Sequence, residues 1–369
     1  MNIGVPRERQ PDEHRVGLTP SAVEQFVAAG HACFIEKHAG VGAGYADLEY
    51  EKAGGRIVYS GEEAYGRANL VLKVSKPTEE EVGWLNDGAI LTGYLHLAAG
   101  RRDRIDALLA KHVTAIAYET IQDDDGALPV QSAMSRLAGM MLPQVAGTLL
   151  QNDRGGKGIL LSGLAGLPPA EIAIIGAGTS GTAAASVFLD LGSSVTVLDR
   201  DLARLHTLEE RLGHGRRPVL MVAYESNIRK AVSYADVLIG AVHVPGGKAP
   251  VVVTRDMVAS MKPRSVVMDI AIDQGGSVET SRPTTHHNPT FVAEGVIHYC
   301  VPNMASVVAR SASQMLGHAA LPFTLALANE GLESALHSHP ALRQGVATHQ
   351  GRVVSTRLAF HLGLPEVSL

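Results

Sequence analysis

Short apolar runs alternate with amphipathic stretches along the first third of the chain. Between the runs, apolar residues recur at helical spacing, and one such stretch begins at Thr19-Pro20 and ends at Gly30. The runs have the length of buried strands and lie at 2–5, 32–36, 56–59, 70–74, 89–94 and 114–117. Because parallel strands need a crossover connection, this alternation predicts a parallel, doubly wound sheet.

The pattern continues after a long helical segment. Helical spacing from Met134 onward predicts a helix that leads into a second domain, with a kink or break near Pro143. Strand-like runs then return at 172–175, 195–198, 219–222, 237–240, 265–270 and 297–299. Residues 311–369 are mainly helical by pattern, and we expect them to return and complete the first domain.

Composition excludes several function classes. With 369 residues, 46% hydrophobic and 19% charged, the chain has the profile of a globular protein of about two domains. A net charge of -5 and the lack of a basic, aromatic-rich stripe disfavour a nucleic-acid partner. The absence of an apolar signal core or membrane-length apolar run predicts a cytoplasmic protein without membrane contact. Cys33 and Cys300 are expected to be buried free thiols, and no residue grouping predicts a metal site.

A glycine motif stands between two of the strand-like runs. Gly176, Gly178 and Gly181 follow the run 172–175 directly, and Asp199 ends the next run. The glycines permit a tight turn, close approach of a pyrophosphate and close packing of helix on strand, while the acid accepts hydrogen bonds from ribose hydroxyls. A 2′-phosphate would meet the negative charge of Asp199. The motif therefore predicts NAD rather than NADP as cofactor.

Together these patterns predict an α/β fold of two Rossmann-like doubly wound domains. A nucleotide-binding domain at 133–307 is inserted in a discontinuous substrate domain formed by 1–132 and 308–369. Ligands of such sheets bind at the carboxyl edge of the strands.

Several separated runs match one family in the same order. They are IGVPRE, HRVGLTP, GYLHLAA, YETIQ, MSRLAG, GAGTSGTAAA, DIAIDQGG and YCVPNM. These runs resemble bacterial alanine dehydrogenases, which are related to the nucleotide-binding subunit of nicotinamide nucleotide transhydrogenase. The resemblance covers essentially the whole chain. It implies interconversion of L-alanine with pyruvate and ammonia, with NAD, on a two-domain hexamer whose substrate lies between the domains.

The resemblance implies roles for three residues. Arg15 would clamp the substrate carboxylate, which suits a planar guanidinium; without the resemblance, its position favours an ordinary residue of a charged loop. His96 would act as acid and base, because imine formation and hydrolysis require repeated proton transfers near neutral pH. Asp273 would be the catalytic aspartate beside the nicotinamide, while its neighbour Asp269 is expected to serve structure at a strand end.

Further contacts follow from the same resemblance. Met134 and Asn303 are candidates for the substrate side, and Ile270 and Met304 for apolar walls around the nicotinamide. With the glycines, Asp199 and Asp273, the expected cofactor set is completed by Ser135, Thr179, Ser180, Arg204, Ile270, Val301 and Met304.

The substrate pocket departs from the family pattern. Alanine dehydrogenases carry Lys-Val-Lys-Glu-Pro, whose second lysine contacts substrate, whereas this chain has Ser75 at that place and Lys76 after it. Lys76 could replace the lysine only if the loop shifted, because neighbours in an extended segment point to opposite sides. Gln131 stands at the apolar position near the substrate methyl group. Relative to the family pattern, the pocket loses a cation at Ser75 and gains a polar side chain at Gln131.

These observations leave three functions open. The leading one is an NAD-dependent L-amino-acid dehydrogenase that reversibly deaminates L-alanine, the default substrate, to pyruvate and ammonia, or acts on a related amino acid. The second is an NAD-dependent imine reductase, opine-type enzyme or cyclodeaminase on a larger amino acid, which Gln131 would contact. The third is a non-catalytic or transhydrogenase-like NAD-binding subunit, which would have no need of both His96 and Asp273.

Overall fold

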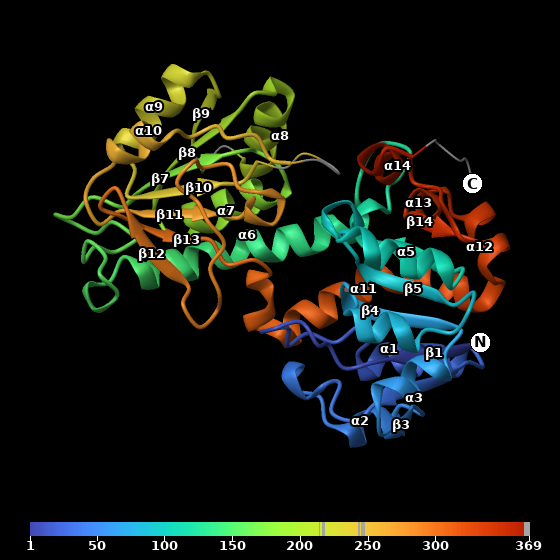
Figure 1. The fold of residues 1–369 in the computed structure, drawn as a ribbon. Helices are drawn as coiled ribbons and strands as arrows, with labels where there is room; N and C mark the ends of the chain where they lie inside the picture. Colours follow the sequence, from blue (N-terminus) through green and yellow to red (C-terminus); the bar gives the residue numbers. More distant parts are fainter. Residues whose placement is uncertain (214, 216–217, 243, 245–247, 365–369) are drawn as a thin grey trace. The chain divides into compact units, whose positions relative to one another are not determined.

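The structure of the protein is a computed structural model, which describes residues 1–213, 215, 218–242, 244 and 248–364 (Figure 1). The chain divides into two compact units. The first consists of Met1–Met134 and Ala305–Leu369, and the second of Ser135–Met304.

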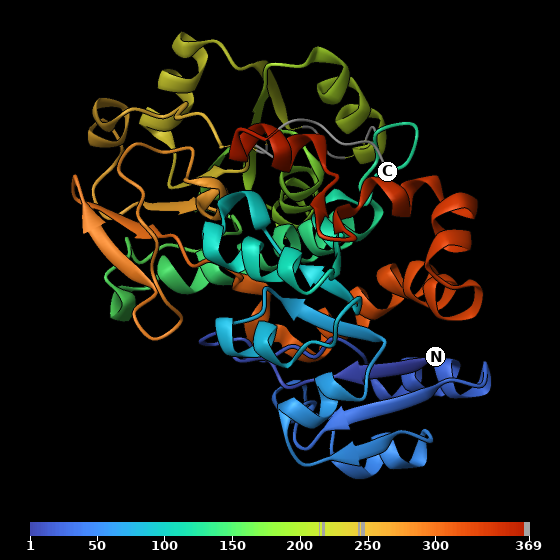
Figure 2. The ribbon, with the colours of Figure 1, turned by 45° about the vertical axis from the view of Figure 1, so that its right-hand side comes forward.

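The first unit is built on a predominantly parallel sheet, whose blue and cyan strands lie side by side in both ribbon views (Figures 1 and 2). In spatial order, its strands are β15 (Arg352–Val353), β14 (Val346–His349), β6 (Thr114–Ala117), β5 (Ile90–Tyr94), β4 (Leu70–Ser75), β1 (Asn2–Val5), β2 (Ala32–Glu36) and β3 (Arg56–Val58). β1 to β6 are parallel, whereas β14 and β15 pair antiparallel. The order reverses between β1 and β4, which is where a doubly wound sheet opens a crevice for ligands.

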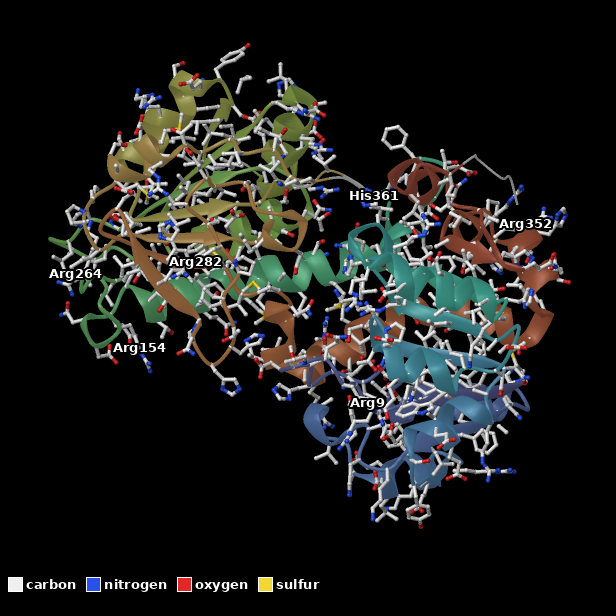
Figure 3. All side chains as sticks on the ribbon, in the orientation of Figure 1. Arg9, Arg154, Arg264, Arg282, Arg352 and His361 are labelled. Atoms are coloured by element: carbon white, nitrogen blue, oxygen red, sulfur yellow. The ribbon has the colours of Figure 1, made fainter. Side chains whose placement is uncertain are left out.

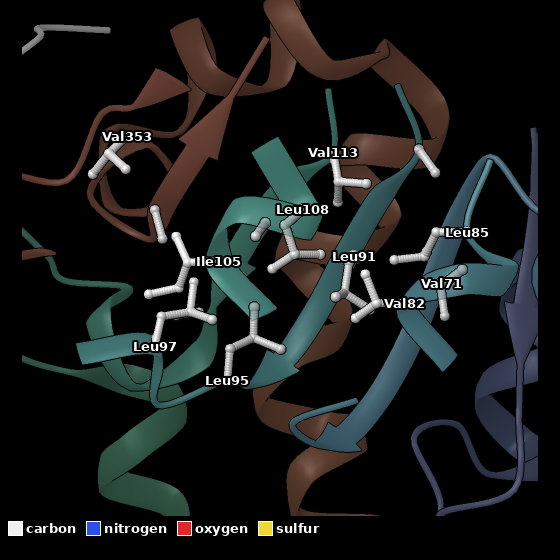
Figure 4. Packing of buried hydrophobic residues seen from close by; sticks show 14 of the residues in the cluster. Val71, Val82, Leu85, Leu91, Leu95, Leu97, Ile105, Leu108, Val113 and Val353 are labelled. Atoms are coloured by element: carbon white, nitrogen blue, oxygen red, sulfur yellow. The ribbon is translucent and has the colours of Figure 1, made fainter. Parts of the chain in front are cut away.

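Helices cover this sheet and bury its apolar face. They are α1 (Pro20–Ala28), α2 (Asp47–Lys52), α3 (Gly61–Gly66), α4 (Glu79–Trp84), α5 (Arg102–Ala110), α11 (Ala309–Glu330), α12 (Leu332–Ser338), α13 (Pro340–Gln344) and α14 (Thr356–Leu362). Thr19 is the N-cap residue of α1 with Pro20 in the first turn, as predicted. In the core, Leu91 and Leu95 of the β5 region meet Ile105 and Leu108 of α5 (Figure 4). This packing fixes the carboxyl end of β5.

The second unit repeats the same arrangement. Its strands, in spatial order, are β12 (Thr290–Ala293), β13 (Val296–Tyr299), β11 (Val266–Asp269), β10 (Val237–Gly240), β7 (Glu171–Ile175), β8 (Ser194–Asp199) and β9 (Val219–Val222). All are parallel except β12. Its helices include α7 (Thr179–Asp190), α8 (Leu202–Leu212), α9 (Glu225–Tyr234) and α10 (Arg255–Ala259). The predicted fold class, two doubly wound α/β domains, is confirmed.

One local prediction was wrong, and three strands were missed. The helix expected from Met134 begins earlier and continues through Pro143, as α6 (Pro129–Leu149), the long green helix of Figure 1. Its packing on α7 is close, since a Cβ on Gly139 would lie 2.3 Å from the Ser180 carbonyl oxygen, and this tertiary contact outweighs the local cost of the proline. The last segment is mainly helical, as expected, but it also contributes β14 and β15, which were not predicted, and β12 was missed in the second unit.

Both cysteines are buried and free, as predicted. Burial raises the pKa of the Cys33 thiol to about 12, so this thiol is protonated and unreactive at neutral pH. Among the described residues, no helix is long and apolar enough to cross a membrane.

Candidate active site and nucleotide site

Two glycines of the motif are required by close backbone contacts in the second unit. Gly176 follows β7 directly and has a φ of +113°, and a Cβ there would lie 2.4 Å from the carbonyl oxygen of Ala241, which follows β10. A Cβ on Gly181 would lie 1.9 Å from the Gly176 carbonyl oxygen. The turn and the packing of α7 on β7 therefore both exclude a side chain.

Gly178 is different, because the protein itself leaves room beside it. In the part of the chain that the structure describes, no atom beyond its two chain neighbours lies within 4 Å of the position that its Cβ would take. It is the N-cap residue of α7 and makes no side-chain cap, and Thr179 and Ser180 begin the helix. The first amides of an α-helix have no intrahelical partner and attract anions. The open space and these amides suit a pyrophosphate.

Asp199 ends β8 and is buried. Its carboxylate accepts hydrogen bonds from the backbone N–H of Ala177, at 2.7 Å, and from that of Asp201, at 2.9 Å. The carboxylate thus ties the glycine loop to the end of β8, and the remaining lone pairs can still accept ribose hydroxyls. The predicted Arg204 lies on α8, with its Nε 3.6 Å from a carboxylate oxygen of Asp201.

Replacing Asp199 with asparagine should weaken the preference for NADH over NADPH. The amide keeps an acceptor for the loop but removes the charge that repels a 2′-phosphate. We expect the ratio of the NADPH dissociation constant to the NADH dissociation constant to fall about tenfold to a hundredfold. Fluorescence titration with both nucleotides measures it. Asp201→Asn is the control for net charge, and an equal change in that variant would contradict the assignment.

The two acids of DIAIDQGG lie in different environments. The Asp269 carboxylate is buried and accepts hydrogen bonds from the backbone N–H groups of Ala271, Ser277 and Val278. Those bonds fold the loop after β11. Asp273, in contrast, is exposed on a short 3₁₀ turn (Ile272–Gln274). Asp273 is thus the acid of this motif that a ligand can reach.

The other predicted residues of the second unit lie on loops and on α6. Val301 and Met304 are buried, Ile270 and Ser135 are half-buried, and Asn303 is exposed with a φ of 52°. Residues 243 and 245–247, which follow β10 in the chain, lie outside the described residues.

In the first unit, a buried charge network lies where the strand order reverses. Lys73 of β4 has no exposed side-chain surface, and its Nζ lies 3.2 Å from the Glu8 carboxylate and 2.7 Å from that of Glu81. Burial lowers the pKa of Lys73, but the two carboxylates outweigh it and the net shift is upward. Burial likewise raises the pKa of Glu81, but Lys73 outweighs it and the net shift is downward. Arg9, labelled in Figure 3, adds a cation 3.7 Å from Glu81.

Replacing Lys73 with methionine should destabilise the protein by about 3–5 kcal/mol, because two buried carboxylates lose their cation. The free energy of unfolding of this variant should also depend less on pH than that of the wild type. The lowered pKa of Glu81 gives stability that is present above its unfolded value of about 4.3 and is lost as pH falls. The raised pKa of Lys73 gives stability that is lost in alkali above about 10.4.

Urea unfolding across the pH range measures this effect, with Lys76→Met, at a half-buried position, as control. Equal stability losses in the two variants would show that the network contributes nothing specific.

Ser75, which replaces the family's lysine, is bound to the same network. Its backbone N–H and its Oγ both donate to a Glu8 carboxylate oxygen, at 3.3 and 2.7 Å. The hydroxyl proton of Ser75 is therefore engaged by Glu8, and its oxygen can only accept hydrogen bonds from a ligand. Lys76 is half-buried, and its carbonyl oxygen accepts from the Gln10 side chain.

Arg15 is buried and paired with Glu13. Nε and Nη2 donate to the two carboxylate oxygens at 2.7 and 2.5 Å. Burial lowers the pKa of Arg15, but Glu13 outweighs it and the net shift is upward. Both residues, with Glu8, line a pocket of about 250 Å³. Because a guanidinium carries five N–H groups, the Nη1 edge remains for a planar anion.

His96 follows β5 between two buried leucines, Leu95 and Leu97, but 47% of its own side chain is exposed. The Tyr94 ring stacks on the imidazole, with centroids 6.1 Å apart. Tyr94 also donates its hydroxyl to the Val130 carbonyl oxygen in the first turn of α6, at 3.1 Å. The same end of α6 carries half-buried Gln131 and buried Met134.

The structure thus places the predicted residues in two groups. Arg15, Ser75, Lys76, His96, Gln131 and Met134 belong to the first unit, and Ser135, the glycine loop, Asp199, Arg204, Ile270, Asp273, Val301, Asn303 and Met304 belong to the second. Sequence reasoning missed Glu8, Glu13 and Glu119, which contact predicted residues. Glu13 stands two positions before Arg15, and Glu119 lies in the YETIQ run directly after a strand, which were the available signals.

Comparison with known proteins agrees with this geometry. A family model described as "Alanine dehydrogenase/PNT, N-terminal domain" matches residues 4–138, and its C-terminal counterpart matches 143–356. The chain belongs to the alanine dehydrogenase/PNT family. The resemblance stated from the sequence motifs is confirmed.

Members of the family are similar over their full length. "Alanine dehydrogenase" of Halomonas elongata is 44% identical over 367 residues, covering 100% of this chain and 98% of that protein. A solved structure titled "L-alanine dehydrogenase" has a TM-score of 0.93 at 41% identity and covers 98% of this chain and 99% of its own. The solved structure of a transhydrogenase from Sinorhizobium meliloti has a TM-score of 0.82 at 26% identity, and the match covers 96% of this chain and 99% of that chain. Of these two structures, the alanine dehydrogenase is the nearer in both sequence and fold.

Proposed function

We propose that the protein is an NAD-dependent L-amino-acid dehydrogenase, which interconverts an L-amino acid with its 2-oxo acid and ammonium. The observation that carries this proposal is that the first unit holds both a buried Arg15, whose Nη1 edge has no hydrogen-bond partner in the described part of the chain, and an exposed imidazole at His96. Full-length similarity to alanine dehydrogenases supports both the reaction class and the cofactor.

Each unit has its own part in this proposal. The domain of 1–132 and 308–369 binds substrate, with Arg15 holding the carboxylate and His96 moving protons to and from the substrate nitrogen and oxygen. The domain of 133–307 holds the cofactor, which when bound supplies the hydride acceptor. The glycine loop and Asp199 orient the nucleotide, and Asp273 stabilises the reacting centre. Ile270 and Met304 form apolar walls that exclude water from the nicotinamide.

Ser75 bears directly on the substrate. Where a lysine would attract an anionic oxygen, Ser75 presents lone pairs beside the Glu8 carboxylate. This arrangement favours a second candidate, an NAD-dependent imine-reducing, opine-type or cyclodeaminase enzyme on a larger amino acid with a hydrogen-bond donor. L-Alanine remains the first substrate to test.

We also propose a cytoplasmic homohexamer, as the family resemblance implies. Exposed leucines on the connection before β7 support association, because 60%, 55% and 57% of Leu160, Leu164 and Leu167 are exposed. Light scattering on the purified protein measures the molar mass, and a monomer would contradict the oligomer.

The test of function is NADH oxidation with ammonium and pyruvate, run beside larger and more polar 2-oxo acids. Turnover with pyruvate would mean that Ser75 is tolerated. Turnover only with another oxo acid would identify a changed substrate. The matched variant Ser75→Lys should lower KM for pyruvate, and silence across the whole panel in both proteins would contradict the proposal.

A further inference from the structure

His96 has an unusual backbone for a residue with a side chain. Its φ and ψ are both 44°, in the left-handed region, directly before a 3₁₀ turn (Leu97–Ala99). This turn of the chain lets Leu95 and Leu97 enter the core, where Figure 4 shows them, while the imidazole faces outward. A left-handed non-glycine residue persists where its surroundings hold it.

Glu119 makes the contact that holds this turn. Its Oε1 accepts a hydrogen bond from the His96 backbone N–H at 2.6 Å, and the same atom lies 3.7 Å from the imidazole Nδ1. The other oxygen, Oε2, is buried and has no hydrogen-bond partner among the residues that the structure describes. A buried carboxylate oxygen without a partner is costly, so a merely stabilising role would be poorly served by this geometry.

The carboxylate stands on a fixed support. Glu119 is the central residue of a 3₁₀ turn (Tyr118–Thr120) that follows β6. On one side of the turn, Ala117 donates its N–H to the Gly345 carbonyl oxygen at 2.8 Å, and on the other Gln122 donates to that of Ala341 at 3.3 Å. The C-terminal segment around β14 therefore sets where Glu119 lies.

We propose that Glu119 is the positioning residue of His96. Its bond to the backbone N–H holds the left-handed turn, and its charge directs Nδ1–H inward, which leaves Nε2 for proton exchange with substrate. Other titratable groups on elements around His96 are Tyr94 and Tyr118, Arg357 and His361 of α14, and Arg101 and Arg102, which pair with Asp103 and Asp106. Glu119 is the acid within 4 Å of the imidazole in the described chain.

This inference rests on the proposed dehydrogenase function, and its test separates the two. Glu119→Ala should lower kcat about tenfold to a hundredfold while leaving KM and the Kd of NADH unchanged, because a misplaced acid and base slows chemistry rather than binding. Glu119→Gln should recover only part of the rate, since its amide oxygen can still accept the His96 backbone N–H bond but the charge that directs Nδ1–H is lost.

A matched pair elsewhere controls for folding. His38 is also left-handed, and Asp47 accepts from its backbone N–H at 2.8 Å and lies 3.3 Å from its Nδ1. Asp47→Ala removes an equivalent contact and should leave kcat unchanged; because His38 also lines the pocket that holds Arg15, kcat and not KM is the readout of this control.

The deciding comparison repeats Glu119→Ala in a His96→Ala background, with residual rates from single-turnover traces. A residue that acts through His96 should cause no further loss there. An equal loss in both backgrounds, or a normal kcat for Glu119→Ala alone, would overturn the proposal. A normal rate in His96→Ala itself would contradict the acid and base assignment, whereas a wild-type protein inactive with every oxo acid of the panel would contradict the proposed function.

Discussion

His96→Ala should lower kcat about a hundredfold to ten-thousandfold, which is the usual contribution of a general acid and base. The imidazole is the exposed titratable group beside Tyr94 at the carboxyl end of β5, and its two leucine neighbours remain buried without it. Stability should therefore change little. Steady-state kinetics with NADH, ammonium and oxo acid measure the rate, and fluorescence titration measures NADH binding.

Binding is the discriminating readout in this experiment. Because His96 belongs to the first unit and the glycine loop to the second, the Kd of NADH should stay at the wild-type value. His112 offers a matched control, since it is another exposed histidine with a positive φ, of 53°, and His112→Ala should retain full activity. A His96→Ala enzyme of near-normal kcat would contradict the acid and base assignment.

Alanine at Gly181 should weaken NADH binding about a hundredfold and lower stability by about 1–3 kcal/mol. Its Cβ would lie 1.9 Å from the Gly176 carbonyl oxygen, so α7 must move away from the end of β7. That movement displaces the amides that receive the pyrophosphate. Isothermal titration gives the affinity, and urea unfolding of the apoprotein gives the stability.

Gly178→Ala separates the ligand from the fold. Among the described residues, no atom beyond its chain neighbours lies within 4 Å of its new methyl group, so the free energy of unfolding should fall by about 1 kcal/mol at most, which is the cost of alanine at an N-cap. NADH binding should nevertheless weaken, because the open space beside Gly178 is where the pyrophosphate would approach. Unchanged affinity in Gly178→Ala would place the nucleotide elsewhere.

Much of the fold could be predicted because its signals are local. The parallel strands of both sheets are continuous apolar runs, and Gly176 to Gly181 mark a turn whose geometry only glycine fits. The missed strands are short and lie toward sheet edges, as β15 with two residues does, so they carry little periodic signal. The break expected near Pro143 is absent from α6, because packing on α7, which the local sequence does not show, stabilises the helix.

The site could be predicted only in part, for a related reason. Arg15, His96 and Asp273 stand in recognisable motifs, and their roles stay predictions. The pairs Arg15–Glu13 and His96–Glu119, and the Glu8 contact that occupies Ser75, depend on tertiary distances. Glu119 is 23 residues from His96 in the chain, and only the pairing of β5 with β6 brings the two together.

The most direct test of the central claim follows the hydride itself. The protein is incubated with ammonium, pyruvate or the best oxo acid of the panel, and NADH carrying deuterium at nicotinamide C4, and the product is analysed by mass spectrometry. The account predicts an L-amino acid with one deuterium on Cα. NADH consumption without label in an amino acid, or label in a product that contains no new amine, would contradict it.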